Sequence, residues 1–156
     1  MSAEREDLSR LALVFHKHNV EFVLIGARAA AFYGHARATE DYDFLIQDSE
    51  RNIQSCIEAL RELYPHIELD LTPADFYKSI VVKILDDPEL DVSIQAWTLN
   101  YEDTRVDQQQ VVIDGVNIPY LGIDSLIQSK LTMREQDKWD VQVLQEIKRS
   151  KAGPTG

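Results

Sequence analysis

The sequence predicts an α/β or α+β protein in which helices flank a mixed β-sheet, with a helical segment toward the C-terminal end. Short apolar runs typical of buried strands alternate along the chain with stretches whose apolar residues recur at helical spacing. Asp114-Gly115 stands between two apolar runs, which is the strongest short signal for an antiparallel hairpin in this chain. A hairpin combined with intermixed strands and helices indicates a sheet of parallel and antiparallel pairs.

Helices are predicted where apolar residues recur every three or four positions between suitable end residues. Ser2 and Ser49 are candidate N-caps, and Gly34 is a candidate C-cap. The predicted helices cover residues 3–18, 27–33, 50–64, 122–135 and 137–148, with a turn or short helix at 72–77.

Strands are predicted from short apolar or alternating runs that are bounded by turn-forming residues. Asp86-Asp87-Pro88 is typical of a turn between two of them. The predicted strands cover residues 21–25, 41–46, 66–71, 79–85, 90–96 and the two arms of the hairpin within 111–120.

The chain length of 156 residues predicts one domain, which we place at residues 1–149, followed by a disordered tail at 150–156. The 16 Lys and Arg residues are outnumbered by 27 Asp and Glu residues, so the formal net charge is -11. A negative field repels phosphate backbones at long range. This balance excludes a nucleic-acid binder that works by overall charge alone.

The single cysteine, Cys56, excludes internal disulfides and Cys-based zinc sites. The first nine residues are charged and lack the apolar core of a secretory signal. No apolar run approaches the length that spans a bilayer. The sequence therefore predicts a cytoplasmic protein without a membrane partner.

Asp41 and Asp43 lie two residues apart on a predicted strand, so their side chains point to the same face of the sheet. Carboxylates a few ångströms apart repel each other, and such pairs are typical of sites where a cation neutralises them. Mg²⁺ prefers one or two carboxylates together with substrate phosphate oxygens. The alternative is that both are solvent-facing strand residues of an acidic protein.

A third carboxylate on a neighbouring strand would complete a two-metal site for phosphoryl or nucleotidyl transfer. Asp91 is the preferred third member because it begins an alternating apolar run. Asp70, Asp86 and Asp87 are competing candidates, although the last two have the character of turn residues.

A turn that attracts phosphate is predicted one strand before the carboxylate pair. Gly26 follows the strand at 21–25 and precedes a helix, and glycine there lets a ligand approach the backbone closely. A helix N-terminus offers free N–H donors and a positive dipole, and Arg28 would lie in its first turn. The order of these two features along the chain is more specific than either feature alone.

A resemblance to a known family rests on two segments, IGARAAAFYG at residues 25–34 and RATEDYDF at 37–44. They resemble the nucleotidyltransferase superfamily, and more closely its minimal-nucleotidyltransferase branch, which includes toxins of the abortive-infection type. That branch has a strand, Gly-Gly or Gly-Ser, a helix, and then Asp-x-Asp. A helical motif of the branch is similar to the C-terminal residues Lys130, Arg134, Asp137 and Asp140, so the resemblance covers most of residues 20–148.

The resemblance implies a polymerase-beta-like fold that transfers a nucleoside monophosphate from an NTP to a hydroxyl or similar acceptor, with Mg²⁺ or Mn²⁺ as cofactor. It implies that Asp41 and Asp43 hold the metals. Asp91 would be the third ligand and would help to deprotonate the acceptor, provided that it reaches it within hydrogen-bond distance. The residues implied to contact the nucleotide are Gly26, Arg28, Thr39, Lys130 and Arg134.

Each of the polar nucleotide contacts has a structural alternative. Thr39 would either contact nucleotide or hold the loop before Asp41. Lys130 and Arg134 lie four residues apart, on one face of a predicted helix, where they would neutralise the triphosphate or the leaving pyrophosphate. The alternative is that they belong to the solvated face of that helix.

The sequence departs from the family pattern where Ala27-Arg28 replaces the second Gly or Gly-Ser. This removes a small hydroxyl residue, and Arg28 would either replace it as a phosphate-binding cation or block the pocket. The first hypothesis is therefore an active nucleotidyltransferase, the toxin of a toxin–antitoxin pair, whose acceptor is RNA, protein or a small molecule. The second is an inactive relative that binds nucleotide or a partner protein as an antitoxin or adaptor. A structural interaction domain is the third.

Overall fold

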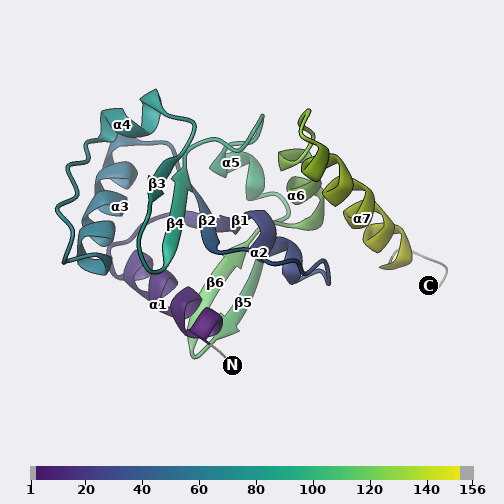
Figure 1. Ribbon diagram of the computed structural model, residues 1–156, viewed down its shortest axis with the longest axis horizontal. Helices are drawn as coiled ribbons and strands as arrows, with labels where there is room; N and C mark the ends of the chain where they lie inside the picture. The colour runs from purple at the N-terminus through teal and green to yellow at the C-terminus, as the bar shows by residue number, and fades with distance from the viewer. Residues whose placement is uncertain (1–2, 152–156) are drawn as a thin grey trace.

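The computed structural model describes residues 3–151 (Figure 1). The strands are β1 (Phe22–Ile25), β2 (Asp41–Ile46), β3 (Val82–Ile84), β4 (Glu89–Ser93), β5 (Gln109–Ile113) and β6 (Val116–Tyr120). The helices are α1 (Ala3–Lys17), α2 (Gly26–Ala31), α3 (Glu50–Leu63), α4 (Pro73–Lys78), α5 (Tyr101–Thr104), α6 (Ile123–Ser129) and α7 (Glu135–Lys151).

The strands of the described residues form one mixed sheet in the order β3-β4-β2-β1-β6-β5. β2 pairs antiparallel with β1 and parallel with β4, while β1 pairs parallel with β6. Figure 1 shows α3 and α4 at one end of the molecule and α6 and α7 at the other. This arrangement confirms the predicted mixed sheet with flanking helices and a C-terminal helical segment.

The two faces of β2 differ because successive side chains of a strand point to opposite faces of the sheet. Phe44 lies on the face that packs against α1, and its ring centroid is 5.2 Å from that of Phe15 and 5.7 Å from that of Phe22. All three side chains are buried. Asp41 and Asp43 therefore lie on the opposite face of the sheet.

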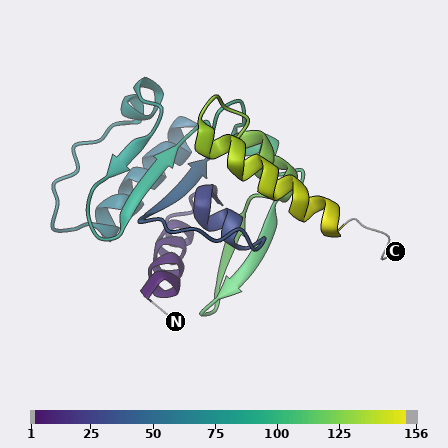
Figure 2. The same ribbon diagram turned by 45° about the vertical axis from the view of Figure 1, so that its right-hand side comes forward.

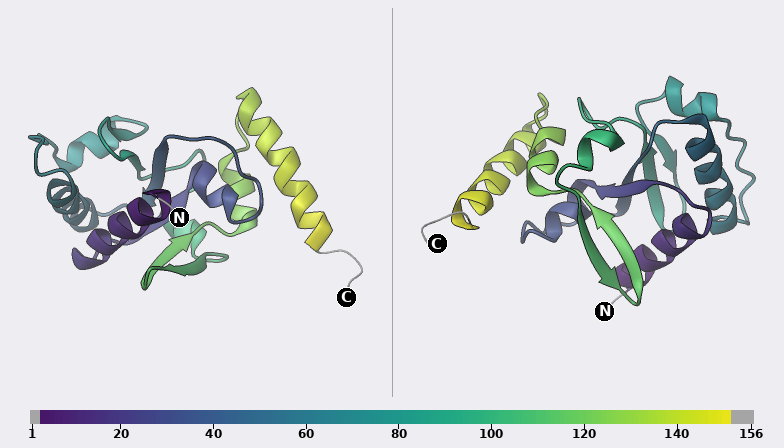
Figure 3. Two further views of the ribbon diagram at one scale, coloured as in Figure 1. Left: turned by 60° about the horizontal axis from the view of Figure 1, so that its bottom comes forward. Right: turned by 180° about the vertical axis from the view of Figure 1, so that it is seen from behind.

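β5 and β6 form the predicted hairpin. Asp114 and Gly115 join them with φ angles of 52° and 78°, the positive values that a type I′ turn requires at both central residues. The hydroxyl group of Ser9, on α1, donates a hydrogen bond to the Asp114 carboxylate at 3.4 Å. Figure 3 shows the hairpin extending from the sheet beside α1.

Residues 66–71 form a loop, and the prediction of a strand there is wrong. The side chain of Leu69 is partly buried against the core. The carbonyl groups of Leu69 and Leu71 accept hydrogen bonds from the Arg61 guanidinium of α3 at 3.4 and 3.3 Å. The alternation of apolar residues in this segment therefore reflects a loop packed against a helix, without a partner strand.

The C-terminal helices are divided differently from the prediction. α6 ends at Ser129, and the segment 130–134 links it to α7. The Thr132 hydroxyl accepts a hydrogen bond from the Arg134 amide at 3.2 Å and donates one to the Asp137 carboxylate at 2.6 Å, so it closes the start of α7. Lys130 and Arg134 consequently do not share one helical face.

Most other boundaries agree with the prediction within a few residues. Ser49 caps α3 as predicted and accepts a hydrogen bond from the Asn52 amide at 3.2 Å. β3 and β4 are shorter than the predicted strands at 79–85 and 90–96. α7 includes Ser150 and Lys151, which the prediction placed in the tail. The candidate cap Ser2 and the remaining tail residues lie outside the described residues.

The buried carboxylate of Asp140 fixes α7 to the segment that leads into β2. It accepts hydrogen bonds from His35 at 2.7 Å, Lys130 at 2.8 Å, Gln136 at 3.1 Å and Arg37 at 3.3 Å. Burial opposes its ionisation, but the hydrogen bonds from Lys130 and His35 outweigh burial and lower the pKa of Asp140 to about 2. Figure 2 shows α7 as a long rod along that end of the molecule. No helix within residues 3–151 combines the length and apolar character needed to cross a membrane.

Replacing Asp140 by alanine is expected to lower the free energy of unfolding by about 3–5 kcal/mol, since the buried Lys130 ammonium loses its nearest partner and keeps only Asp137, at 3.9 Å, among the ion pairs of the described residues. Asp140 contributes stability above pH 4 that is lost as the pH falls toward its folded pKa of about 2. The difference between variant and wild type should therefore shrink in that window. Urea unfolding at pH 7 and pH 3 measures both effects.

The matched control is Glu146→Ala, which removes a carboxylate of α7 whose pair with Arg149 is exposed on both sides. Its unfolding free energy should change by less than about 0.5 kcal/mol. Equal losses in the two variants would contradict the anchoring role of Asp140.

Candidate functional site

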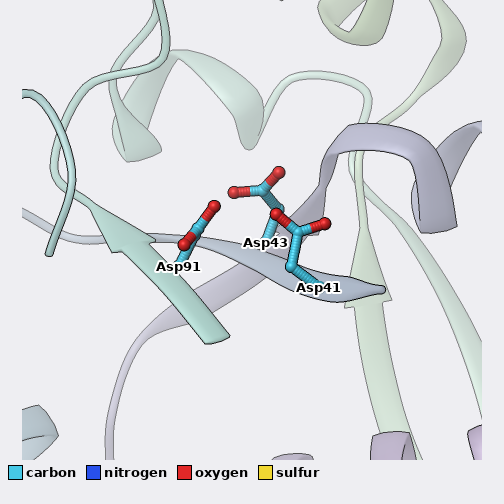
Figure 4. Close-up of side chains that lie close together, drawn as sticks. All are labelled: Asp41, Asp43 and Asp91. Atoms are coloured by element: carbon cyan, nitrogen blue, oxygen red, sulfur yellow. The ribbon is translucent and has the colours of Figure 1, made fainter. Parts of the chain in front are cut away.

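Three carboxylates converge on the face of the sheet opposite α1. Asp41, Asp43 and Asp91 each offer a carboxylate oxygen, and these oxygens all lie within 4.8 Å of one another. Figure 4 shows the three side chains rising from β2 and β4 toward one another. The structure therefore brings together the predicted pair and the preferred third carboxylate, whereas Asp70, Asp86 and Asp87 are outside this group.

The strand register explains why these residues meet. Asp43 of β2 stands opposite Asp91 of β4, and the two strands are parallel. Asp41 shares the face of Asp43 because it lies two positions earlier on the same strand. A shift of one residue in the pairing would turn Asp91 to the buried face, so the apolar pattern of β4 also fixes the position of its carboxylate.

Gly26 makes room for the central carboxylate. Its φ angle is 73°, and a Cβ atom at this position would lie 2.6 Å from Oδ2 and 3.0 Å from Cβ of Asp43. A side chain at residue 26 would therefore collide with Asp43 as well as strain the backbone. Gly26 is the first residue of α2, which has six residues, whereas the prediction placed this helix at residues 27–33 with Gly26 before it.

Thr39 orients the first carboxylate. Its hydroxyl donates a hydrogen bond to Oδ1 of Asp41 at 2.8 Å. Burial opposes the ionisation of Asp41, but the hydrogen bonds from Thr39 and from the Asp91 carboxyl outweigh it and lower the pKa of Asp41. Burial raises the pKa of Asp91, and the hydrogen bond to Asp41 adds to this rise.

Asp43 carries the least compensated charge of the three. Burial, followed by the charges of Asp91 and Asp41, raises its pKa to about 7. The positive charges of Lys83 and Lys130 act in the opposite direction but do not offset these causes. The Asp43 carboxyl group therefore keeps its proton at pH values well above those at which an aspartic acid usually ionises.

Lys83 is part of this cluster and was not identified from the sequence. It lies on β3 directly opposite Asp91, and its amine donates hydrogen bonds to both carboxylate oxygens, at 2.8 and 3.0 Å. Asp43, Asp91 and Lys83 thus form a row across three adjacent strands. Lys83 alternates with the buried Val82 and Ile84, and this alternation is the signal that places it on the face of the carboxylates.

Arg28 lies on the other side of the sheet from the three carboxylates. Its guanidinium donates to the carbonyl oxygens of Asp41 at 2.9 Å and Thr39 at 3.2 Å, and it stacks over the Tyr42 ring at 3.8 Å. The Tyr42 side chain points away from those of Asp41 and Asp43 because it lies between them on the strand. Arg28 neither fills nor blocks the space above the carboxylates.

The two C-terminal cations are placed differently from each other. Lys130 is buried, and its amine is bound to Asp140 at 2.8 Å. Arg134 has a side chain that is 79% exposed and is paired only with Asp137 at 3.8 Å among the ion pairs of the described residues. The structure thus brings Lys130 into the electrostatic field of Asp43 but does not gather both cations at one point.

The donor set fits a divalent cation. Carboxylate oxygens are the ligands that Mg²⁺ and Mn²⁺ favour, and three of them converge here. Burial, followed by the charges of Asp91 and Asp41, raises the pKa of Asp43, so ionisation of this carboxyl is opposed in the protein alone. A divalent cation would relieve this repulsion by displacing the remaining protons.

Comparison with known families identifies the chain. Residues 7–124 match the family described as nucleotidyl transferase AbiEii toxin, Type IV TA system, which is more than half of the sequence. The chain belongs to the AbiEii nucleotidyltransferase toxin family. The match contains Gly26, Thr39 and all three carboxylates, and it ends before Lys130 and Arg134. The comparison with curated proteins gives no match.

A solved structure supports the fold of this AbiEii family member. The chain is similar to the crystal structure of an antigenic nucleotidyltransferase-like protein from Paracoccidioides brasiliensis, with a TM-score of 0.61 and 17% sequence identity. The similarity covers 94% of this chain and 77% of that one. The mixed sheet and its helices therefore form a nucleotidyltransferase-like fold, as the resemblance implied.

Replacing Gly26 by alanine should destabilise the protein by about 1–3 kcal/mol, because a non-glycine residue is strained at this φ angle. It should also displace the Asp43 carboxylate, which lies where the new Cβ would stand. Urea unfolding measures the first effect, and Mn²⁺ binding measures the second. The control is Gly34→Ala, where φ is also positive but nothing lies within 4 Å of the new atom. Equal Mn²⁺ binding by the two variants would contradict the role of the close approach.

Replacing Asp43 by asparagine should stabilise the metal-free protein at pH 8. In the wild type, the folded state holds the Asp43 proton up to a pKa of about 7, whereas the unfolded state releases it near 3.8. The unfolded state then binds fewer protons, so wild-type stability falls as the pH rises from about 4 to about 7. The gain in the variant should grow across this window to at most about 4 kcal/mol.

The measurement is urea unfolding in EDTA at pH 4, 6 and 8. Asp70→Asn removes an exposed carboxylate outside the cluster and should show no such growth. A gain for Asp43→Asn that is the same at every pH would contradict the raised pKa.

Proposed function

We propose that this protein is a Mg²⁺- or Mn²⁺-dependent nucleotidyltransferase that transfers a nucleoside monophosphate from an NTP to an acceptor hydroxyl. The observation that carries the proposal is the convergence of Asp41, Asp43 and Asp91 within a nucleotidyltransferase-like fold. Membership of the AbiEii family supports a role as the toxin of a toxin–antitoxin pair, with an antitoxin as its protein partner. The acceptor is RNA, protein or a small molecule, and the proposed location is the cytoplasm.

Three carboxylates would hold the cofactor in this proposal. Asp41 and Asp43 would each bind the cation through a carboxylate oxygen on the face of β2 that they share, and Asp91 would add a third oxygen from β4. When bound, the divalent cation would neutralise charge on the triphosphate and on the leaving pyrophosphate. Thr39 holds the Asp41 carboxylate in orientation, and Gly26 leaves the space in which Asp43 stands.

The proposed step is an attack by the acceptor hydroxyl oxygen on the α-phosphorus of the NTP. The bond from that phosphorus to the oxygen bridging to the β-phosphate breaks, and pyrophosphate leaves. The proton of the acceptor hydroxyl passes to a carboxylate oxygen of Asp91, which acts as the general base. Lys83 stabilises the ionised form of Asp91 through two hydrogen bonds. The ionised carboxylate is the form that can accept the proton of the acceptor hydroxyl.

The residues proposed to contact the nucleotide contribute in different ways. Gly26 allows close approach of phosphate to the backbone at the start of α2. Thr39 and Arg28 act mainly through the strand, because both are bound to Asp41. Lys130 supplies positive potential from its buried position, and Arg134 is exposed and free to turn toward a leaving pyrophosphate.

A second candidate function is nucleotide or partner binding without catalysis, as an antitoxin or adaptor. It is favoured by one observation at the start of α2. Ala27 and Arg28 offer no hydroxyl there, and the Arg28 guanidinium is bound on the opposite face of the sheet. The phosphates would then lack one ligand that the family pattern has at this point.

The test combines ligand binding with product analysis. Each NTP, with Mn²⁺ or Mg²⁺ at about one hundred times its dissociation constant, should stabilise the wild type by about 2.7 kcal/mol. Asp41→Asn and Asp43→Asn should lose this gain, whereas Asp70→Asn should keep it. Pyrophosphate release in the presence of bacterial RNA, protein or metabolite fractions then reports turnover.

The outcomes separate the two candidates. Metal-dependent stabilisation together with pyrophosphate release supports the enzyme. Stabilisation without any product, from a protein that is pure and folded, supports the binding function instead. The absence of both in the wild type would overturn the proposal of a nucleotide site.

A further inference from the structure

The positively charged amine of Lys83 lies within the carboxylate cluster, beside Asp91. This amine lies 2.8 Å from Oδ1 and 3.0 Å from Oδ2 of Asp91, so it bridges the two oxygens of that carboxylate. The Asp91 side chain is 9% exposed and the Lys83 side chain 44% exposed. The lysine therefore reaches the carboxylate from the solvent side of the sheet, at the edge strand β3.

The charge balance of the cluster follows from this contact. When a cation binds and displaces the remaining protons, the three carboxylates carry three negative charges, and the Lys83 ammonium reduces the sum to two. One divalent cation then neutralises the remaining charge. Each carboxylate oxygen has two acceptor directions, so the amine takes one direction on each oxygen of Asp91. Asp91 can still bind a cation through a single oxygen, but it cannot bind one in bidentate fashion while the Lys83 amine contacts both oxygens.

We propose that Lys83 is a positioning residue that serves as the built-in counter-cation of the triad and competes with the divalent cation for Asp91. This inference rests on the proposed function and adds to it a residue that sets how strongly the cation is held. In the metal-free protein, the ammonium takes the place of the missing positive charge beside Asp91. When a cation binds, Lys83 gives up one of its two hydrogen bonds to Asp91. Its exposed side chain can then turn toward the solvent side of the site.

The experiment measures Mn²⁺ binding by electron paramagnetic resonance of the free ion, without nucleotide and without turnover. Lys83→Met removes the charge and keeps the length of the side chain, and it should bind Mn²⁺ about tenfold more tightly than the wild type. Lys83→Arg keeps a cation opposite Asp91 and should bind with an affinity close to that of the wild type. Lys17→Met is the matched control, because Lys17 also pairs with one carboxylate, Glu62 at 2.9 Å, away from the triad.

A second readout detects the counter-cation directly. In EDTA, Lys83→Met should melt at a lower temperature than the wild type, and saturating Mn²⁺ should remove the difference. Lys83 lies on an exposed edge strand, so folding of the variant is checked by circular dichroism before titration. Lys83→Gln provides a second neutral side chain and should behave like Lys83→Met.

The outcomes distinguish this inference from the proposed function. Unchanged or weaker Mn²⁺ binding by both neutral variants would overturn the competition by Lys83, while the metal site itself would stand. If Asp43→Asn binds Mn²⁺ as well as the wild type, the ion lies elsewhere, and the proposed metal site fails. Binding by Lys83→Met but not by the wild type would support the counter-cation and weaken the proposed function. Binding by neither would overturn both.

Discussion

Electrostatic repulsion among three carboxylates on one face of the sheet is the constraint on which the rest of the site depends. Parallel pairing of β2 with β4 places Asp91 beside Asp43, and no rearrangement of side chains can move them far apart. The neighbouring residues each relieve part of the strain. Thr39 binds one oxygen of Asp41, Lys83 binds both oxygens of Asp91, and Gly26 leaves a gap for Asp43. What is left is a central carboxyl group whose pKa is raised to about 7.

The same chain treats another buried carboxylate in the opposite way. Asp140 is fully buried, yet its pKa falls to about 2 because four side chains donate hydrogen bonds to it. The protein is thus able to satisfy a buried carboxylate completely with its own cations. It does so at Asp140, which links α7 to the segment before β2, and it does not do so at Asp43. This contrast argues that the charge of the triad is left for a ligand and is not a by-product of an acidic composition.

Much of this arrangement could be predicted from the sequence because it follows from short-range patterns. The spacing of Asp41 and Asp43 fixes their common face, the alternating run after Asp91 fixes the third carboxylate, and Asp114-Gly115 fixes the hairpin. Lys83 was missed because its role depends on the register of the β3–β4 pair, which decides that Lys83 stands opposite Asp91, and the residue pattern of either strand alone does not set that register. The strand expected at 66–71 failed for a related reason, since Arg61 takes the carbonyl groups that a partner strand would need. The direction of the Arg28 side chain depends on the Tyr42 ring beneath it, which is also a tertiary contact.

The departure of Ala27-Arg28 from the family pattern changes the site less than the sequence alone suggested. An arginine that reached the three carboxylates would compete with phosphate or cation for them, but this one is held by two backbone carbonyl groups and an aromatic ring on the other face. Its hydrogen bond to the Asp41 carbonyl instead braces the strand that carries two of the three carboxylates. What the site lacks relative to the pattern is one hydroxyl ligand for phosphate, and what it retains is the full set of carboxylates. Loss of a single neutral hydrogen bond to a bound nucleotide costs about 0.5–1.5 kcal/mol, which weakens binding without removing the chemistry that the carboxylates would support.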